Sequence, residues 1–264
     1  MQPLMLVRTS LALLGCVLAS TLACKSTAQQ ECATSDNDCS AQQRLVDEIT
    51  HENRELKAEV ERLTAELETE RGCRQQVIGS LTAFAEGPYD EVTTEFVENA
   101  LELLEARVAK RKRDEKLAIV LDVDETAVSN IEQLRGSTYC FVREDWNEWV
   151  DVGVPVELPG IRPLYDYARE HEVAVVFLSG RKEAQREDTE RVLKAAGFEH
   201  WERVLLRDPS EDKLTAAEFK SARRAQLEAE GFSVVLTVGD QQSDLDGGHA
   251  EHAVLIPNPF YFVK

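Results

Sequence analysis

A short apolar run that ends in two aspartates places the strongest constraint on what this chain folds into. Residues 117–121, LAIVL, are uninterrupted apolar residues with β-branched members. A run of this kind is typical of a strand buried on both faces, as in a parallel sheet. Asp122 and Asp124 follow it directly, and alternation in an extended chain puts both carboxylates on one side. Ligand sites of open parallel sheets lie beyond the carboxyl ends of strands, so we expect the chemistry here.

The two aspartates need a positive partner, because neighbouring carboxylates repel each other unless a cation or a proton separates them. We interpret one carboxylate as bound to a hard divalent cation and the other as free to carry a proton. A second acidic strand end supports this interpretation. The expected strand at 233–238 leads into Gly239 and Asp240, and Asp244 follows shortly after.

The DVDET stretch at 122–126, followed by Ser129 and Asn130, resembles the acid phosphatase branch, subfamily IIIB, of the haloacid dehalogenase (HAD) superfamily. This branch includes class B and class C acid phosphatases of bacteria and vegetative-storage-type proteins of plants. The resemblance runs from about residue 84 to the C-terminus. It implies an α/β fold with a HAD-like Rossmannoid parallel sheet and helices on both faces. It also implies that Asp122 is the nucleophile, and that Asp124 is a general acid and base whose backbone carbonyl binds Mg²⁺.

Ser179, Gly180 and Arg181 follow the apolar run at 173–178, and a helix is expected over 182–196. A hydroxyl and a backbone N–H at a helix N-terminus suit a phosphate oxygen. Serine is also a common helix cap, but the match to the family's second motif favours phosphate binding by Ser179 and Gly180. Arg181 either binds substrate or holds the loop.

Two lysines compete for the role of phosphate ligand. The family pattern K-S-x-R on a helix, followed by a strand and Gly-Asp, is matched by residues 220–223 and the strand at 233–238. Lys220 is therefore the expected ligand, although without this pattern it would be interpreted as a solvated helix lysine. Lys213 lies in a polar stretch that is typical of a loop before a helix.

The resemblance also implies a Mg²⁺ site built from oxygen ligands. The expected ligands are the Asp122 carboxylate, the Asp124 carbonyl and the Asp240 carboxylate, completed by water and substrate. Asp244 is expected to support these ligands from outside the shell of the ion.

Aromatic residues gather between positions 139 and 149, where Trp146 and Trp149 lie. One interpretation is a small apolar cluster that covers an end of the sheet. The other is an aromatic wall which, with Arg181, forms a substrate pocket able to stack a flat leaving group. The family uses this region in the second way, and both interpretations stay open.

The N-terminal region predicts export. Residues 1–23 contain one basic residue before an apolar stretch, as in a secretory signal peptide. The stretch ends in a sequence similar to a bacterial lipobox, so we expect lipidation at Cys24, with Cys16 or plain secretion as alternatives. Residues 24–41 are polar and predict a lipidated, disordered tether. These features indicate an exported protein of the bacterial cell envelope, lipid-anchored in the outer membrane or periplasm.

The sequence spacing leaves the disulfide pairing of the other cysteines open. These are Cys32, Cys39, Cys73 and Cys140.

Residues 42–76 predict a coiled coil ahead of a HAD-like domain at 77–264. Apolar residues repeat at alternating spacings of three and four, and a single asparagine falls within the repeat. β-branched residues and one asparagine at position a, with leucine mostly at d, favour a parallel two-stranded coil and hence a homo-oligomer. The alternative is an amphipathic helix packed on its own domain. The heptad residues are Val46, Asn53, Val60 and Leu67 at a, and Ile49, Leu56 and Leu63 at d.

Charge and motif together predict the function. A net charge of −19 over 264 residues argues against binding of nucleic acid. We expect a Mg²⁺-dependent phosphomonoesterase, an acid phosphatase, that hydrolyses small organic phosphates through an aspartyl-phosphate on Asp122. Nucleoside 5'-monophosphates are among the expected substrates. The alternatives are a HAD phosphotransferase and a non-catalytic, envelope-anchored coiled-coil protein.

Overall fold

The computed structural model of the protein describes residues 36–263. The predicted signal peptide, the predicted lipidation site Cys24 and its alternative Cys16 lie outside the described residues. The helices and strands, in chain order, are α2 (Asp36–Glu86), α3 (Tyr89–Val108), β1 (Lys116–Leu121), β2 (Val128–Ser129), α4 (Ile131–Gly136), α5 (Arg143–Val152), β3 (Val156–Glu157), α6 (Ile161–Glu170), β4 (Ala174–Lys182), η2 (Glu183–Gln185), α7 (Arg186–Ala195), β5 (Arg203–Arg207), η3 (Pro209–Glu211), α8 (Ala216–Ala229), β6 (Phe232–Gly239), η4 (Gln242–Asp244) and β7 (His252–Leu255).

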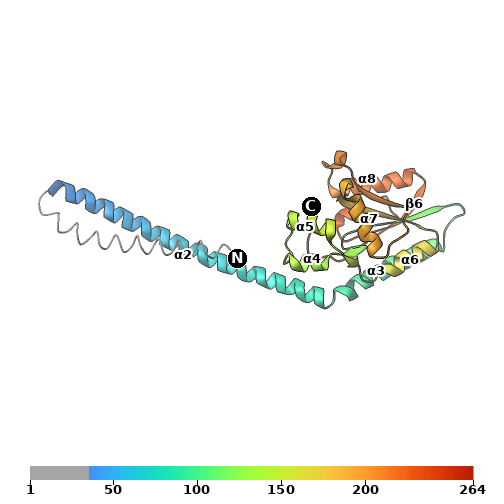
Figure 1. Cartoon of the computed structure of the whole chain (residues 1–264), viewed down its shortest axis with the longest axis horizontal. Helices are drawn as coiled ribbons and strands as arrows, with labels where there is room; N and C mark the ends of the chain where they lie inside the picture. Colours follow the sequence, from blue (N-terminus) through green and yellow to red (C-terminus); the bar gives the residue numbers. More distant parts are fainter. Residues whose placement is uncertain (1–35, 264) are drawn as a thin grey trace. The chain divides into compact units, whose positions relative to one another are not determined.

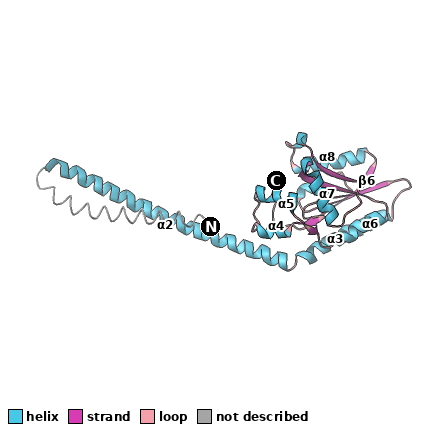
Figure 2. Cartoon of the chain, viewed as in Figure 1, coloured by secondary structure: helices cyan, strands magenta, loops and turns pink. Residues whose placement is uncertain are grey.

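A five-stranded parallel sheet forms the centre of the C-terminal unit, in the order β5-β4-β1-β6-β7 (Figure 2). The central strand β1 pairs with β4 on one side and with β6 on the other. The three apolar runs of the sequence therefore lie next to one another. Because parallel strands end at the same edge, the residues that follow these runs are brought together there.

Alternate side chains of β1 enter two apolar layers, one on each face of the sheet. Leu117, Ile119 and Leu121 pack into the larger layer, which includes residues of α3, α6 and α7. Val120 packs into the smaller layer with Phe219 of α8. In Figure 1, α3 and α6 lie together on the side of the sheet away from α8. Helices thus cover both faces, which confirms the predicted fold class.

Strand β4 runs further than the sequence suggested. Residues 179–181, expected at the N-terminus of a helix, belong to this strand, and Lys182 pairs with Arg207 of β5 after a shift of register. The following helix begins only at Arg186, after the short turn η2. The helix expected over 182–196 is therefore wrong at its start, because pairing with β5 keeps this segment extended.

Helix α2 begins at Asp36, inside the segment that was expected to be a tether. The chain divides into two compact units between Cys73 and Arg74, a few residues before the predicted boundary. No helix within residues 36–263 is long and apolar enough to cross a membrane.

Candidate active site

Lys220 holds two of the predicted carboxylates together. Its Nζ donates to a carboxylate oxygen of Asp122 and to one of Asp244. Lys220 comes from α8, Asp122 follows β1 directly, and Asp244 ends the turn η4, and all three side chains are buried. The backbone N–H of Asp122 donates to the carbonyl of Val238 at 3.0 Å, which fixes its place at the sheet edge. Lys213 is exposed, in the loop before α8.

Asp240 completes a cluster of three carboxylates. One oxygen each of Asp122, Asp240 and Asp244 lie within 4.8 Å of one another. A glycine before Asp240 makes this closeness possible, since a Cβ on Gly239 would lie 2.2 Å from the Asp244 side chain. The N–H of Gln241 donates to Asp244 Oδ2 at 2.9 Å. Asp244 thus lies inside the cluster, whereas the sequence analysis expected it outside the shell of ligands.

The charges of this cluster do not balance. Burial raises the pKa of Asp122 well above its usual range; Lys220 opposes this rise, and the neighbouring aspartates add to it. Burial, together with Asp244 and Glu125, raises the pKa of Asp240 to about 7. Burial alone would lower the pKa of Lys220, but the charges of Asp122 and Asp244 outweigh it and raise the pKa. Three carboxylates therefore share one ammonium group, and a further cation would relieve their repulsion.

The donor set of the cluster fits Mg²⁺. Buried carboxylate oxygens are the ligands that this hard cation prefers, and it is commonly bound through one or two carboxylates plus substrate phosphate. The three aspartates offer one such oxygen each, and a cation bound there would offset the negative charge that Lys220 leaves unbalanced. The carboxylate of Asp124 bonds to Arg181, so any part of Asp124 in this site would be its backbone carbonyl, as the family resemblance implies.

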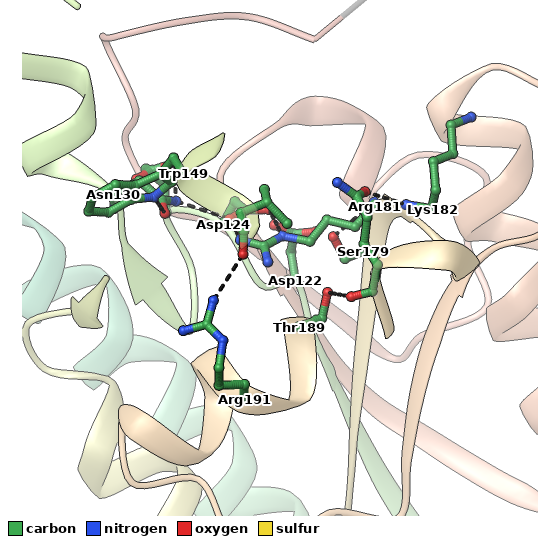
Figure 3. Close-up of polar contacts among 12 residues, drawn as sticks. Asp122, Asp124, Asn130, Trp149, Ser179, Arg181, Lys182, Thr189 and Arg191 are labelled. Carbon is green, nitrogen blue, oxygen red and sulfur yellow. Dashed lines mark hydrogen bonds and ion pairs between the residues drawn. The ribbon is translucent and has the colours of Figure 1, made fainter. Parts of the chain in front are cut away.

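Asp124 lies between Arg181 and Asn130 (Figure 3). Arg181 Nε donates to Oδ2 at 2.9 Å and Nη2 to Oδ1 at 2.6 Å. Asn130 Nδ2 also donates to Oδ1, at 3.0 Å. Burial favours a raised pKa for Asp124, but the charge and hydrogen bonds of Arg181, with a hydrogen bond from Asn130, outweigh burial and lower the pKa. Asp124 is thus held in one orientation as a carboxylate.

A chain of hydrogen bonds extends from Asp124 to helix α5. Trp149 Nε1 donates to Asn130 Oδ1 at 2.7 Å, which turns the Asn130 amide nitrogen toward Asp124. The N–H of Asn130 also donates to Glu125 Oε1 at 2.6 Å. Burial, and then the charge of Asp124, raises the pKa of Glu125 to about 7. One of the two predicted pocket tryptophans therefore acts on Asp124 through Asn130, and neither aromatic interpretation had anticipated this contact.

The other predicted residues surround the same edge of the sheet. Ser179 is buried at the end of β4, and its Oγ accepts a hydrogen bond from the N–H of Arg181 at 3.2 Å. Gly180 is exposed, and, its two chain neighbours aside, no atom of residues 36–263 lies within 4 Å of where its Cβ would be, so a ligand can approach its backbone. The guanidinium of Arg181 lies 5.9 Å from the ring centre of Trp146. The Nη1 atom of Arg181 is buried and has no hydrogen-bond partner among the described residues.

A residue next to the K-S-x-R pattern anchors the acidic loop. Arg224 is fully buried and donates from Nη1 to the carbonyl of Asp244 at 2.6 Å and from Nε to that of Gly248 at 2.8 Å. Arg223, which fitted the pattern, pairs with Glu211 at 2.8 Å. The only hint of this anchor in the sequence is that a second arginine follows Arg223 directly.

Comparison with known proteins identifies the family. Residues 40–264 match the HAD superfamily, subfamily IIIB (acid phosphatase). The chain belongs to this family. As a subfamily IIIB protein it is similar to the stem 28 kDa glycoprotein of Glycine max, with 33% identity over 155 residues, covering 56% of this chain and 61% of the relative. It is 34% identical over 148 residues to acid phosphatase 1 of Solanum lycopersicum, covering 54% of this chain and 58% of the relative.

A solved structure shares the fold. The class C acid phosphatase from Bacillus anthracis aligns with a TM-score of 0.60 and 25% identity, covering 72% of this chain and 86% of that chain, and it has also been solved with tungstate bound. The subfamily IIIB chain described here spans about three fifths of the length of the plant relatives named above.

Proposed function

We propose that this protein hydrolyses phosphomonoesters with the help of Mg²⁺, through an aspartyl-phosphate on Asp122. The observation that carries the proposal is the bridge from Lys220 to Asp122 and Asp244, with Asp240 beside it. It supports roles for Asp122 as the nucleophile, for Lys220 as the cation that meets the phosphoryl group, and for the aspartates as oxygen ligands of the ion. Membership of the acid phosphatase subfamily supports the same chemistry.

In the first step, a carboxylate oxygen of Asp122 attacks phosphorus in line, a new O–P bond forms, and the bond to the leaving alcohol breaks. Lys220, the Ser179 hydroxyl and the Gly180 N–H hold the other phosphoryl oxygens. The aspartates would hold Mg²⁺, and its positive charge would stabilise the negative charge on the phosphoryl oxygens. Tungstate is a tetrahedral oxyanion like phosphate, so its binding to the Bacillus anthracis relative supports an oxyanion site here.

Asp124 serves both steps of the reaction. It gives a proton to the leaving alcohol and then takes one from the water that hydrolyses the aspartyl-phosphate. The lowered pKa of Asp124 favours the carboxylate, which is the form needed in the second step. The first step needs the protonated form, which acid pH favours. Membership of the acid phosphatase subfamily supports activity on the acid side of neutrality. The Asp122 nucleophile must stay ionised there, which a cation bound to the aspartates would favour.

The aromatic helix α5 supports a substrate with a flat leaving group. Trp146 lies beside Arg181, and Arg181 bonds to the carboxylate that would protonate the leaving alcohol. A nucleobase or an aryl ring could stack on an aromatic side chain placed there. Small organic phosphates, with nucleoside 5'-monophosphates among them, are therefore the proposed substrates.

A simple assay tests the proposal. The purified chain should release phosphate from an aryl phosphate in the presence of Mg²⁺, and chelation with EDTA should abolish release until Mg²⁺ is restored. Full activity after exhaustive chelation would contradict the metal requirement. No release under any divalent cation would favour the non-catalytic alternative. Transfer of the phosphoryl group to an added alcohol in preference to water would favour a phosphotransferase.

The N-terminal unit is proposed to join two copies of the chain. The d-position residues of α2 are exposed within one chain: Ile49 at 41%, Leu56 at 57% and Leu63 at 50%. An apolar stripe of this period along a helix favours a second helix as partner, and β-branched residues with one asparagine at a favour a parallel pair. Export and lipid attachment at Cys24 remain proposals that rest on the sequence.

A further inference from the structure

Two amide side chains hold the same oxygen of Asp240. Asn258 Nδ2 donates to Asp240 Oδ2 at 2.7 Å, and Gln241 Nε2 donates to the same oxygen at 2.5 Å. Among the described residues, no donor bonds Oδ1. One oxygen of this carboxylate is therefore occupied, and the other is left for the acidic cluster.

Both amides are turned toward Asp240 by one backbone segment, residues 258–263. The N–H of Phe260 donates to Asn258 Oδ1 at 2.9 Å, and the N–H of Val263 donates to Gln241 Oε1 at 2.9 Å. An amide oxygen only accepts and an amide nitrogen only donates. Since each oxygen is held by a backbone N–H, each nitrogen must face the carboxylate, which also settles the orientation of the two amides.

The segment 258–263 packs against other parts of the domain. Phe260 is 5% exposed, and its ring stacks on that of Tyr139 with 5.5 Å between the ring centres. Tyr261 OH donates to Glu125 Oε2 at 2.6 Å, next to Asp124. The segment thus makes contacts toward both acidic strand ends, through Asn258 and Val263 at one and through Tyr261 at the other. Phe262 is 85% exposed.

We propose that the 258–263 segment orients Asp240 for the divalent cation, with Asn258 and Gln241 as positioning residues that fix Oδ2 and present Oδ1 to the ion. This inference rests on the proposed Mg²⁺ site. Groups that hold a metal ligand through hydrogen bonds set its orientation, and their loss typically weakens metal affinity by about 10–100-fold. The segment acts through Asp240 and does not touch the phosphoryl group.

Calorimetric titration of the whole chain with Mg²⁺ alone tests the inference. Asn258→Ala should bind Mg²⁺ about 10–100-fold more weakly than wild type, while kcat at saturating Mg²⁺ falls far less. Phe262→Ala is the matched control, because its exposed ring lies in the same segment and should leave the affinity unchanged. Thermal unfolding in EDTA checks that each variant folds.

A second variant covers the case in which Asn258→Ala fails to fold. Val263→Pro removes the N–H that holds Gln241 Oε1, and the Val263 side chain is 51% exposed, so the core is untouched. It should also weaken Mg²⁺ binding. Wild-type affinity in the folded variants would overturn the inference and leave the proposed function standing. Absence of Mg²⁺ binding by the wild type would overturn both.

Discussion

Arg181 holds Asp124 with two hydrogen bonds, from Nε to Oδ2 at 2.9 Å and from Nη2 to Oδ1 at 2.6 Å. Paired bonds of this kind fix the plane of a carboxylate as well as its distance. The side chain of Arg181 is only 3% exposed, and its Nη1 has no partner among the described residues. Arg181 can therefore orient the proposed acid and base while keeping one donor for an anionic substrate.

Replacement of Arg181 should impair the chemical step. Arg181→Met removes both bonds to Asp124, and general acid–base catalysis typically contributes 10²–10⁴-fold, so we expect kcat to fall on the order of 10²-fold. Arg181→Lys should recover little, because a single ammonium cannot make two parallel bonds. Arg203→Met is the control, since Arg203 pairs with Glu230 away from the site. If steady-state kinetics give Arg181→Met the kcat of wild type, Arg181 does not contribute to the chemical step.

Lys220 and Lys213 should respond very differently to substitution. Lys220→Met takes away the cation that bridges Asp122 and Asp244, and loss of one such contact to developing charge costs on the order of 10²-fold or more in kcat. Lys213 is exposed, so Lys213→Met should stay near wild type. Both variants are measured side by side under saturating Mg²⁺. A large loss for Lys213→Met with little change for Lys220→Met would reverse the assignment.

The stability of the domain should depend on pH through Glu115. Hydrogen bonds from Arg107 and from the Lys112 N–H lower the pKa of Glu115 to about 2, below its ordinary value of 4.5. Its contribution is therefore present above about pH 4.5 and is lost as the pH falls toward 2. Urea unfolding should show Glu115→Gln less stable than wild type at pH 7, with the difference shrinking at pH 3. Asp114→Asn, at a side chain 90% exposed, should match wild type throughout. A difference that stays constant with pH would contradict this origin.

Self-association should depend on the apolar stripe of α2. Leu56→Glu combined with Leu63→Glu places charges at two d positions and should dissociate the chain at micromolar concentration. Ala58→Glu combined with Ala65→Glu adds the same charge on the outer face and is the matched control. Sedimentation velocity compares both with wild type. A wild-type chain that sediments as a monomer would contradict the coiled-coil prediction.

The strands and the functional residues that follow them could be predicted because their sequence signal is local. The apolar runs before Asp122, Ser179 and Asp240 each mark a buried strand, and parallel pairing then brings their ends together. The start of α7 was missed because a pairing between Lys182 and Arg207 keeps the chain extended, and no local pattern announces such a pairing.

The contacts that orient the carboxylates could not be predicted in the same way. The bond from Arg181 to Asp124 joins residues 57 positions apart, and that from Asn258 to Asp240 joins residues 18 apart. Such pairs depend on the path of the chain and not on residue periodicity. The choice between Arg223 and Arg224 depends on which side of α8 faces the acidic loop, which the motif alone does not give.

The covalent intermediate on Asp122 tests the central claim most directly. The enzyme is mixed with an aryl phosphate and Mg²⁺, quenched in acid and digested, and the peptides are analysed by mass spectrometry. We expect a phosphoryl group on the peptide that contains Asp122. We also expect Asp122→Asn, which keeps the shape of the side chain, to fold like wild type and to show neither the modified peptide nor turnover. Undiminished phosphate release by Asp122→Asn, or a phosphoryl group on another residue, would contradict the proposed mechanism.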